Sequence, residues 1–187
     1  MSKKVLDLVS STFGDEVLAT HSRLGNDTAV VRRDRLVEIA TFLRDDPRIK
    51  MDLLRDITAV DYLQRKPRFE VVYVFYSIEL KHMLLLRVPL EAGDVSIPSL
   101  HMLYGCAGWL EREVYDMYGM DFTDHPDLRR VLLYDEFEGH PLRKDYAVQQ
   151  SQPRVKLRKR ERDSVEEFME YYQEVPTAGS RPGRASE

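Results

Sequence analysis

The stretch FEVVYVFYS, residues 69–77, decides the fold class of this 187-residue chain. Nearly all of its residues are β-branched or aromatic, which is the composition of a central strand covered on both faces. Two further β-rich stretches flank it, residues 51–60 before it and residues 82–90 after it. The three stretches therefore predict neighbouring strands of one sheet.

Upstream of these strands, hydrophobic spacing predicts a helix, a hairpin and a second helix. The apolar residues within 5–13 fall in a helical window. Residues 16–20 and 28–32 predict two short strands joined by a turn at residues 25–27. An apolar stripe over residues 36–43 predicts the second helix, and Asp34 is in place to be its N-cap.

The best-marked helix follows the last of the strands. Its apolar residues stand three or four positions apart: Leu100, Leu103, Ala107, Leu110, Val114 and Met117. Gly119 ends the run. The pattern predicts one helix that begins at Ser99 and is ~30 Å long at 1.5 Å per residue. Its apolar stripe is expected to lie across the whole sheet.

The predicted order of elements is α-β-β-α-β-β-β-α, which indicates an α+β fold, a mixed β-sheet sandwich with helices on one face. Residues 120–146 follow neither periodicity, yet they carry too many apolar side chains for a disordered segment. We expect this long irregular C-terminal arm to lie on a surface of its own chain or of a partner. We predict a core domain at residues 1–119, a partner-binding arm at 120–150 and a charged, partly disordered tail at 151–187.

Composition excludes several classes of protein. A net charge of −4 gives no global reason to bind nucleic acid, and the apolar runs are far shorter than the ~20 residues that span a bilayer. The single cysteine, Cys106, excludes an internal disulfide and a four-thiolate iron–sulfur cluster, and its apolar neighbours predict a small core side chain. Nucleotide-binding glycine motifs and hydrolase motifs are absent. We expect a soluble, cytosolic protein without an active site of its own.

Four charged residues lie within the predicted third helix: Glu111, Arg112, Glu113 and Asp116. One interpretation is a solvated helix face on which Arg112 and Asp116 form an i,i+4 ion pair. The other is a buried or interfacial charge network, which the aromatic neighbours Trp109, Tyr115 and Tyr118 favour because they leave little solvent-like surface. Spacing alone leaves both open.

Two histidine–proline turns, fifteen residues apart, follow that helix. The first holds His125, Pro126, Asp127, Arg129 and Arg130, and the second holds Gly139, His140, Pro141, Arg143, Lys144 and Asp145. Paired histidines are compatible with a metal site or an acid–base pair, but no third ligand stands at a metal-like spacing. Arginines are suited to bidentate contacts with carboxylates across an interface. We therefore favour a partner-binding role for these turns over a metal site.

The segment WLEREVYDMYGMDFTDHPDLRRVLLYDEFEGHPLRKDY, residues 109–146, closely resembles the characteristic sequence of the 30 kDa subunit of respiratory complex I, which in bacteria is the C-type subunit of NADH–quinone oxidoreductase. The family pattern is W-x-E-R-E-x-x-D-M-[FY]-G, followed by H-P-D-L-R-R and G-H-P-L-R-K-D-[FY]. Thr123 and Asp124 depart from it, because members often carry a glycine before the first histidine. The resemblance covers residues 53–146 well and the preceding residues only in outline.

The resemblance implies a non-catalytic structural subunit in the peripheral (hydrophilic) arm of a proton-translocating NADH–quinone oxidoreductase, on the cytoplasmic side of the bacterial inner membrane. Such an assembly passes electrons from NADH through FMN and iron–sulfur clusters to quinone, and the resemblance implies that partner subunits hold these cofactors and that this chain holds none. The implied partners are a protein of the 49 kDa (D) type and the cluster-bearing subunits of the B and I types, with no nucleic acid. The implied interface residues are Glu111, Arg112, Glu113, Asp116, His125, Pro126, Asp127, Arg129, Arg130, Gly139, His140, Pro141, Arg143, Lys144 and Asp145.

Three alternatives remain open at this point. In the first, the chain is an equivalent subunit of a related membrane-bound hydrogenase or other quinone-linked dehydrogenase complex. In the second, it is an independent metal enzyme that uses His125 and His140. The third concerns the basic run at residues 154–162, which anionic lipid headgroups would attract. The acidic run at residues 163–174 argues against that role, because it cancels the basic charge.

Overall fold

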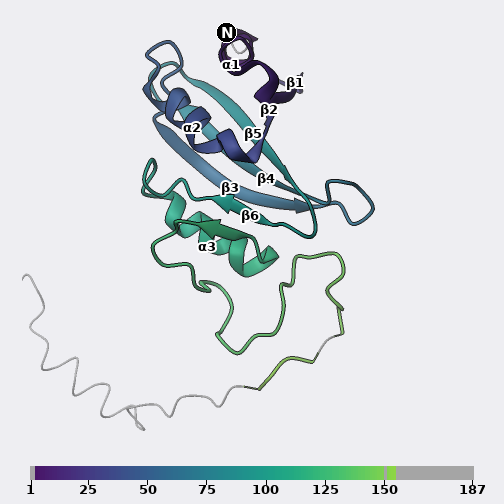
Figure 1. Cartoon of the computed structure of the whole chain (residues 1–187). Helices are drawn as coiled ribbons and strands as arrows, with labels where there is room; N and C mark the ends of the chain where they lie inside the picture. Colours follow the sequence, from purple (N-terminus) through teal and green to yellow (C-terminus); the bar gives the residue numbers. More distant parts are fainter. Residues whose placement is uncertain (1–2, 150, 155–187) are drawn as a thin grey trace, which may run out of the picture. The chain divides into compact units, whose positions relative to one another are not determined.

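A computed structural model describes residues 3–149 and 151–154 of the chain (Figure 1). In chain order the elements are α1 (Lys3–Phe13), β1 (Val17–Arg23), β2 (Asn26–Val31), α2 (Leu36–Asp45), β3 (Leu53–Asp61), β4 (Phe69–Ser77), β5 (His82–Leu90), β6 (Ser96–Pro98), α3 (Ala107–Tyr118) and β7 (Asp121–Thr123), with 3-10 turns at Gly14–Glu16 and Arg33–Arg35. The predicted α+β fold is confirmed. The chain divides into a compact unit of residues 1–153 and a second unit of residues 154–187. Apart from Arg154, the predictions for the second unit lie outside the described residues.

Five strands form one mixed sheet in the order β1-β2-β5-β4-β3. The β2–β5 pair is parallel and the other pairs are antiparallel. The stretch FEVVYVFYS forms β4 with the predicted bounds, between β3 and β5, and its Tyr73 and Phe75 are fully buried. The composition of this stretch therefore correctly predicted an interior strand of the sheet, although the middle position of the five belongs to β5.

The core lies on one face of the sheet. Alternate strand residues, such as Tyr73 and Leu86, pack with buried residues of the helices, such as Val9 of α1 and Ile39 of α2. Figure 1 shows α2 running over the strands on that side. On the opposite face Leu85 of β5 is half-buried, whereas Val72 of β4 is buried without belonging to this core. This arrangement confirms helices on one face of a mixed sheet.

The third helix is shorter than predicted. It begins at Ala107 instead of Ser99, and residues 99–106 form turns that precede it. Its closest contacts with the sheet are with the edge strand β3, so it does not lie across the whole sheet. The reason is visible in Glu111, whose carboxylate accepts hydrogen bonds from the Ser99 hydroxyl and the Leu100 N–H and so folds that turn back onto the helix. The apolar stripe still faces the core.

Two smaller predictions are wrong. Asp34 does not cap α2, because a 3-10 turn at Arg33–Arg35 precedes the helix and Asp34 is exposed beside Arg33. Cys106 is exposed instead of belonging to the core, because it precedes the helix and lies off its apolar stripe; its thiol is 3.3 Å from the Leu54 carbonyl oxygen.

The arm, defined here as residues 120–149, starts inside the domain. Its first residues form β7, which pairs in parallel with β6, and Met120 and Phe122 are buried in the core. From residue 124 onward the arm has no regular structure, as predicted, and it passes along α3 (Figure 1). The arm is therefore anchored at its beginning by ordinary strand pairing and core packing.

Candidate functional site

The charged residues of α3 form a buried network and not a solvated face. Glu111 and Asp116 are fully buried and Arg112 is nearly so, whereas Glu113 is exposed. Arg112 and Asp116 do not pair with each other, because each binds a different part of the arm. Of the two interpretations that spacing left open, the buried network is correct for three of the four residues.

Asp116 is the centre of this network. Its carboxylate accepts hydrogen bonds from three consecutive backbone N–H groups of the arm, those of Val131, Leu132 and Leu133, at 3.1, 2.8 and 2.9 Å. Arg130 donates to its other oxygen at 2.7 Å. Burial by itself raises the pKa of Asp116, but these four donors outweigh burial and lower it below the ordinary value. The carboxylate thus fixes the arm backbone where it crosses the helix.

Arg112 and Arg130 hold the arm from opposite sides. Arg112 donates to the carbonyl oxygens of Arg129 and Arg130, both at 3.0 Å, and its guanidinium stacks 4.7 Å from the centre of the Trp109 ring. The Arg130 guanidinium reaches across the arm to the carbonyl oxygens of Phe137 and Gly139, at 3.0 and 3.2 Å. One arginine from the helix and one from the arm therefore close the first loop of the arm.

The second histidine–proline turn binds the end of α3. The His140 Nδ1–H donates to the Asp116 carbonyl oxygen at 2.9 Å, and Arg143 donates to the Tyr118 and Gly119 carbonyl oxygens at 2.5 and 3.3 Å. A helix C-terminus leaves such carbonyls unpaired and attracts positive charge. Gly119 has φ +70°, and a Cβ there would lie 2.5 Å from His140. A glycine is therefore required where the arm crosses the helix end.

The first histidine–proline turn holds the other end of the helix. The His125 Nε2–H donates to the Gly108 carbonyl oxygen at 3.0 Å, and its Nδ1 accepts the Asp127 N–H at 3.0 Å. Both ring nitrogens are occupied, which leaves neither for a metal. Glu111 lies 3.9 Å from this ring, and burial raises its pKa. Within residues 3–149 and 151–154, no group of three or more potential ligands is placed to hold a metal ion.

A second anchor of the arm lies on β3, at residues that were not among the predicted interface residues. Asp61 accepts two hydrogen bonds from Arg68, both at 2.8 Å, and one from the Lys144 N–H at 2.8 Å. Arg68 also donates to Asp145 at 2.9 Å. The guanidinium of Arg68 accounts for most of the lowering of the pKa of Asp61. Asp61 and Arg68 flank the loop between two strands, and their sequence spacing carries no signal that a residue about 80 positions later would join them.

The fifteen predicted interface residues divide into two sets. Eight are buried or half-buried and most of these bind the arm to its own chain: Glu111, Arg112, Asp116, His125, Arg130, His140, Pro141 and Arg143. Seven are exposed: Glu113, Pro126, Asp127, Arg129, Gly139, Lys144 and Asp145. Large apolar side chains that were not among the predicted residues are also exposed, among them Trp109 at 65% and Leu132 at 62%.

We call the exposed residues Trp109 and Glu113 of α3, together with Arg129 and Leu132 of the arm, the α3–arm surface. The Trp109 ring stacks on Arg112, and Arg112 in turn binds the backbone at Arg129. Leu132 lies three residues further along the arm, and its backbone N–H donates a hydrogen bond to the Asp116 carboxylate. The buried network therefore ties the part of α3 that carries the exposed Trp109 to the part of the arm that carries the exposed Arg129 and Leu132.

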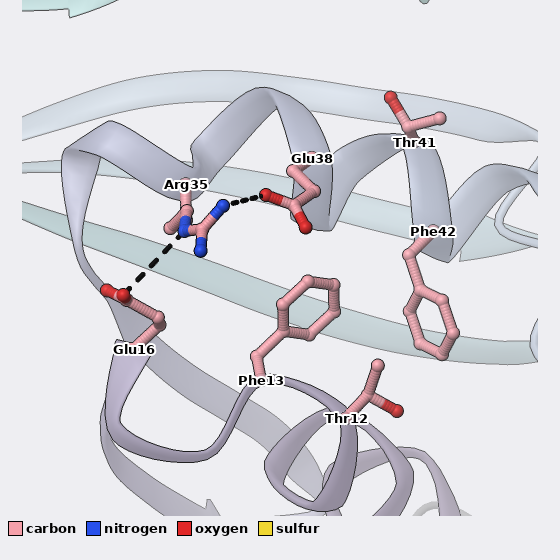
Figure 2. A pocket seen from close by; sticks show the side chains of 7 residues that line it. All are labelled: Thr12, Phe13, Glu16, Arg35, Glu38, Thr41 and Phe42. Atoms are coloured by element: carbon pink, nitrogen blue, oxygen red, sulfur yellow. Dashed lines mark hydrogen bonds and ion pairs between the residues drawn. The ribbon is translucent and has the colours of Figure 1, made fainter.

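A hollow of about 540 Å³ lies between α1 and α2, away from the predicted residues (Figure 2). Phe13 and Phe42 meet edge to face in it, with ring centres 5.3 Å apart. Arg35 points between Glu16 and Glu38, at 3.7 and 2.5 Å. Because these charges pair with one another, the hollow offers no unpaired charge to anchor a ligand.

Comparisons with known proteins agree on one family. The family described as the 30 kDa subunit of respiratory-chain NADH dehydrogenase matches residues 29–152. Two relatives, from Geotalea uraniireducens and Geobacter sulfurreducens, are each named as the C subunit of NADH-quinone oxidoreductase. They are 42% and 44% identical over 73% of this chain, and the matches cover 82% and 84% of their own lengths.

Two solved structures share the fold. A trypsin-resistant fragment of Nqo5 matches with a TM-score of 0.59 and 31% identity, over 67% of this chain and 98% of the fragment. A chain of the membrane-bound sulfane sulfur reductase, an archaeal respiratory membrane complex, matches with a TM-score of 0.65 over 98% of both chains. At 17% identity the second match concerns the fold alone. Among the described residues, no helix is both long and apolar enough to cross a membrane.

Proposed function

Because the chain belongs to the family of the 30 kDa subunit of respiratory-chain NADH dehydrogenase, we propose that it is the C-type subunit of an NADH–quinone oxidoreductase and that its task is structural. It holds neighbouring subunits of the peripheral arm in fixed positions and performs no redox step. Electron transfer slows steeply with distance, so the subunits that carry redox centres require a rigid frame. A folded domain with a locked arm meets that requirement.

The observation that supports this proposal most strongly is that the polar side chains of α3 and the arm are occupied by hydrogen bonds within the chain. Asp116, Arg112 and His125 all bind backbone atoms of the same chain. A catalytic group instead needs an atom left free to reach a substrate. The family's characteristic residues in this region thus determine the shape of a surface.

The α3–arm surface has the composition of a docking site. Trp and Arg are enriched among the residues that dominate binding energy at protein interfaces. Here Trp109, Arg129 and Leu132 are exposed on two segments, α3 and the arm, that the buried network ties together. We propose that this surface contacts a protein of the 49 kDa (D) type, next to cluster-bearing subunits of the B and I types. FMN, the iron–sulfur clusters, NADH and quinone then belong to the partners, and the assembly attaches the chain to the cytoplasmic side of the inner membrane.

Co-purification tests the docking surface. A double variant, Trp109→Ala with Arg129→Ala, is compared with Ile78→Ala, an apolar residue of similar exposure on the turn after β4. We expect the double variant to lose at least about tenfold in recovery of the assembly, since interface anchors contribute ~2 kcal/mol or more. The Ile78→Ala control should recover it fully. Equal recovery by both variants contradicts the proposed surface.

The composition of the recovered assembly tests the identity of the enzyme. The archaeal complex shares only the fold with this chain, whereas relatives 42–44% identical are NADH-quinone oxidoreductase subunits. We therefore expect an FMN-containing protein that oxidises NADH to co-purify with this chain. An assembly that contains a hydrogenase or ferredoxin-fed module instead would assign the chain to a related complex.

A further inference from the structure

We propose that β1 is completed by an extended segment of a neighbouring subunit, which adds a sixth strand to the sheet. The proposal rests on the proposed function, because it requires that the chain work inside an assembly. The strand order places β1 and β3 at the two edges of the sheet. α3 packs against β3, whereas β1 pairs with no strand other than β2, has α1 as its helical neighbour and has no buried residue. The two edges are thus unequal.

The backbone of β1 presents unpaired hydrogen-bonding groups in register for a strand. β1 and β2 are joined by a two-residue turn, Leu24–Gly25, whose φ values of 53° and 80° are those of a type I′ turn. In such a hairpin the flanking pair, Arg23 and Asn26, exchanges hydrogen bonds, and every second pair does the same. The N–H and C=O groups of Thr20 and Ser22 therefore point away from β2, toward the open edge. Those four groups are what an added strand binds.

β1 lacks the usual protection of an edge strand. Natural edge strands are shielded by proline, by lysine, by a bulge or by a covering element. The sequence VLATHSR contains neither proline nor lysine. The one irregularity of pairing falls between Val17 and Ala19, so the pairing from Ala19 to Arg23 is regular. The helix α1 contacts both β1 and β2 and buries Val9 in the core, so it packs on the face of the sheet and not along the outer edge of β1. A regular outer edge without protection is expected where a partner covers it.

Side chains around β1 indicate what kind of segment fits. A hollow of about 250 Å³ lies beside the start of β1, lined in part by Leu18, which is 48% exposed, and by Pro89 and Leu90. Asp15 before the strand and Arg23 at its end are exposed and have no ion-pair partner among residues 3–149 and 151–154. The occupant is therefore an extended segment with an apolar side chain near Leu18, a basic residue near Asp15 and an acidic residue near Arg23. Added strands gain affinity from main-chain hydrogen bonds and specificity from alternate side chains in hollows of this kind.

Amide hydrogen exchange tests the sixth strand directly. The amides of Thr20 and Ser22 are followed in the free full-length chain and in the native assembly recovered through a tag on this chain. We expect both amides to exchange at least about tenfold more slowly in the assembly, while those of β4 are protected in both states. If the chain is in the assembly but these two amides exchange as in the free chain, the sixth strand is wrong and the structural function stands. If the chain recovers no assembly, both proposals fail.

A matched pair of variants separates backbone pairing from side-chain contact. Thr20→Pro removes the outward N–H at an edge position, where proline is tolerated, and Thr20→Ala shortens the side chain but keeps the N–H. We expect Ser22 to lose its protection in the assembly with Thr20→Pro and to keep it with Thr20→Ala. Unchanged β4 amides establish that the Pro variant is folded. Protection of Ser22 that persists in both variants overturns the proposal. So does a free chain that already forms a dimer in which Thr20 and Ser22 are protected, because a second copy of this chain is then the added strand.

Discussion

The five-stranded sheet and the arm are held in place by different forces. Strand β4 is fixed by burial of side chains such as Tyr73 and Phe75 among apolar neighbours. The arm is fixed by polar contacts, above all those of Asp116, which binds three backbone N–H groups about fifteen residues away. Apolar burial depends on the area removed from water, whereas the polar contacts depend on exact partners. The sheet should therefore tolerate conservative changes better than the arm does.

The largest expected effect belongs to the sheet. Phe75→Ala removes a fully buried ring from the centre of the core and should lower the free energy of unfolding by about 3–5 kcal/mol. Because the core is shared, exchange protection should fall throughout the domain. Urea unfolding of the full chain measures the change, with Ile78→Ala as the exposed control. A loss below about 1 kcal/mol would show that Phe75 is not part of the core that holds the fold.

The next effect should remain local to the arm. Asp116→Ala leaves three N–H groups and the Arg130 guanidinium without their acceptor, at a total cost of ~1–3 kcal/mol, because the arm residues are only half-buried or exposed and water reaches the freed groups. We expect exchange at Val131, Leu132 and Leu133 to accelerate, while β4 stays protected. Glu113→Ala, three residues earlier on the exposed side of α3, is the matched control and should leave these amides unchanged. Loss of β4 protection in the Asp116 variant would contradict a separate arm.

Acid should release the arm before it unfolds the sheet. The pKa values of Asp61 and Asp116 are lowered in the folded chain, so their contribution to stability is present above the unfolded value, ~4, and is lost as pH falls through the lowered folded values. The only tryptophan, Trp109, stacks on Arg112 and reports this loss by its fluorescence. We expect its emission to change below about pH 4, and Asp116→Asn should already show the acid-form emission at about pH 7. An emission that changes only together with the circular dichroism of the sheet would argue against early release.

Glu111 should give the smallest effect, with the opposite sign. Burial raises its pKa in the folded chain, so its contribution is present below the unfolded value and is lost as pH rises through the raised folded value. Glu111→Gln keeps an oxygen acceptor near Ser99 and Leu100 and carries no charge. We expect the variant to lose less stability than the natural chain between about pH 4 and pH 7, as urea unfolding at the two pH values measures. A steeper loss in the variant would show that the charged form of Glu111 is the stabilising one.

These two regions also differ in how much the sequence could predict. Periodicity and β-branched composition gave the bounds of β4 and β5, because burial on a regular element leaves a local pattern. The same periodicity extended α3 back to Ser99, because Leu100 is buried on the same side although its turn is not helical. A buried apolar residue shows that a position faces inward, and it does not show which backbone carries it there.

The site was only partly predictable for a related reason. The sequence pattern drew attention to Arg112, Asp116 and Arg130, which the structure brings together where the arm meets α3. Spacing within a helix, however, pointed to an Arg112–Asp116 pair that does not form. Their true partners are backbone atoms of the arm, which have the same chemistry at every residue and leave no trace in composition. Asp61 was missed for the same reason, since one of its partners is the N–H of Lys144.

The most direct test is whether the arm is formed before any partner binds. Amide exchange of the free full-length chain, measured at Val131, Leu132 and Leu133 beside the exposed Glu136, decides it. Because Asp116 binds those three N–H groups, we predict clear protection at all three and free exchange at Glu136. Exchange at the rate of an unfolded peptide at Val131–Leu133 would mean that the partner, and not α3, gives the arm its shape.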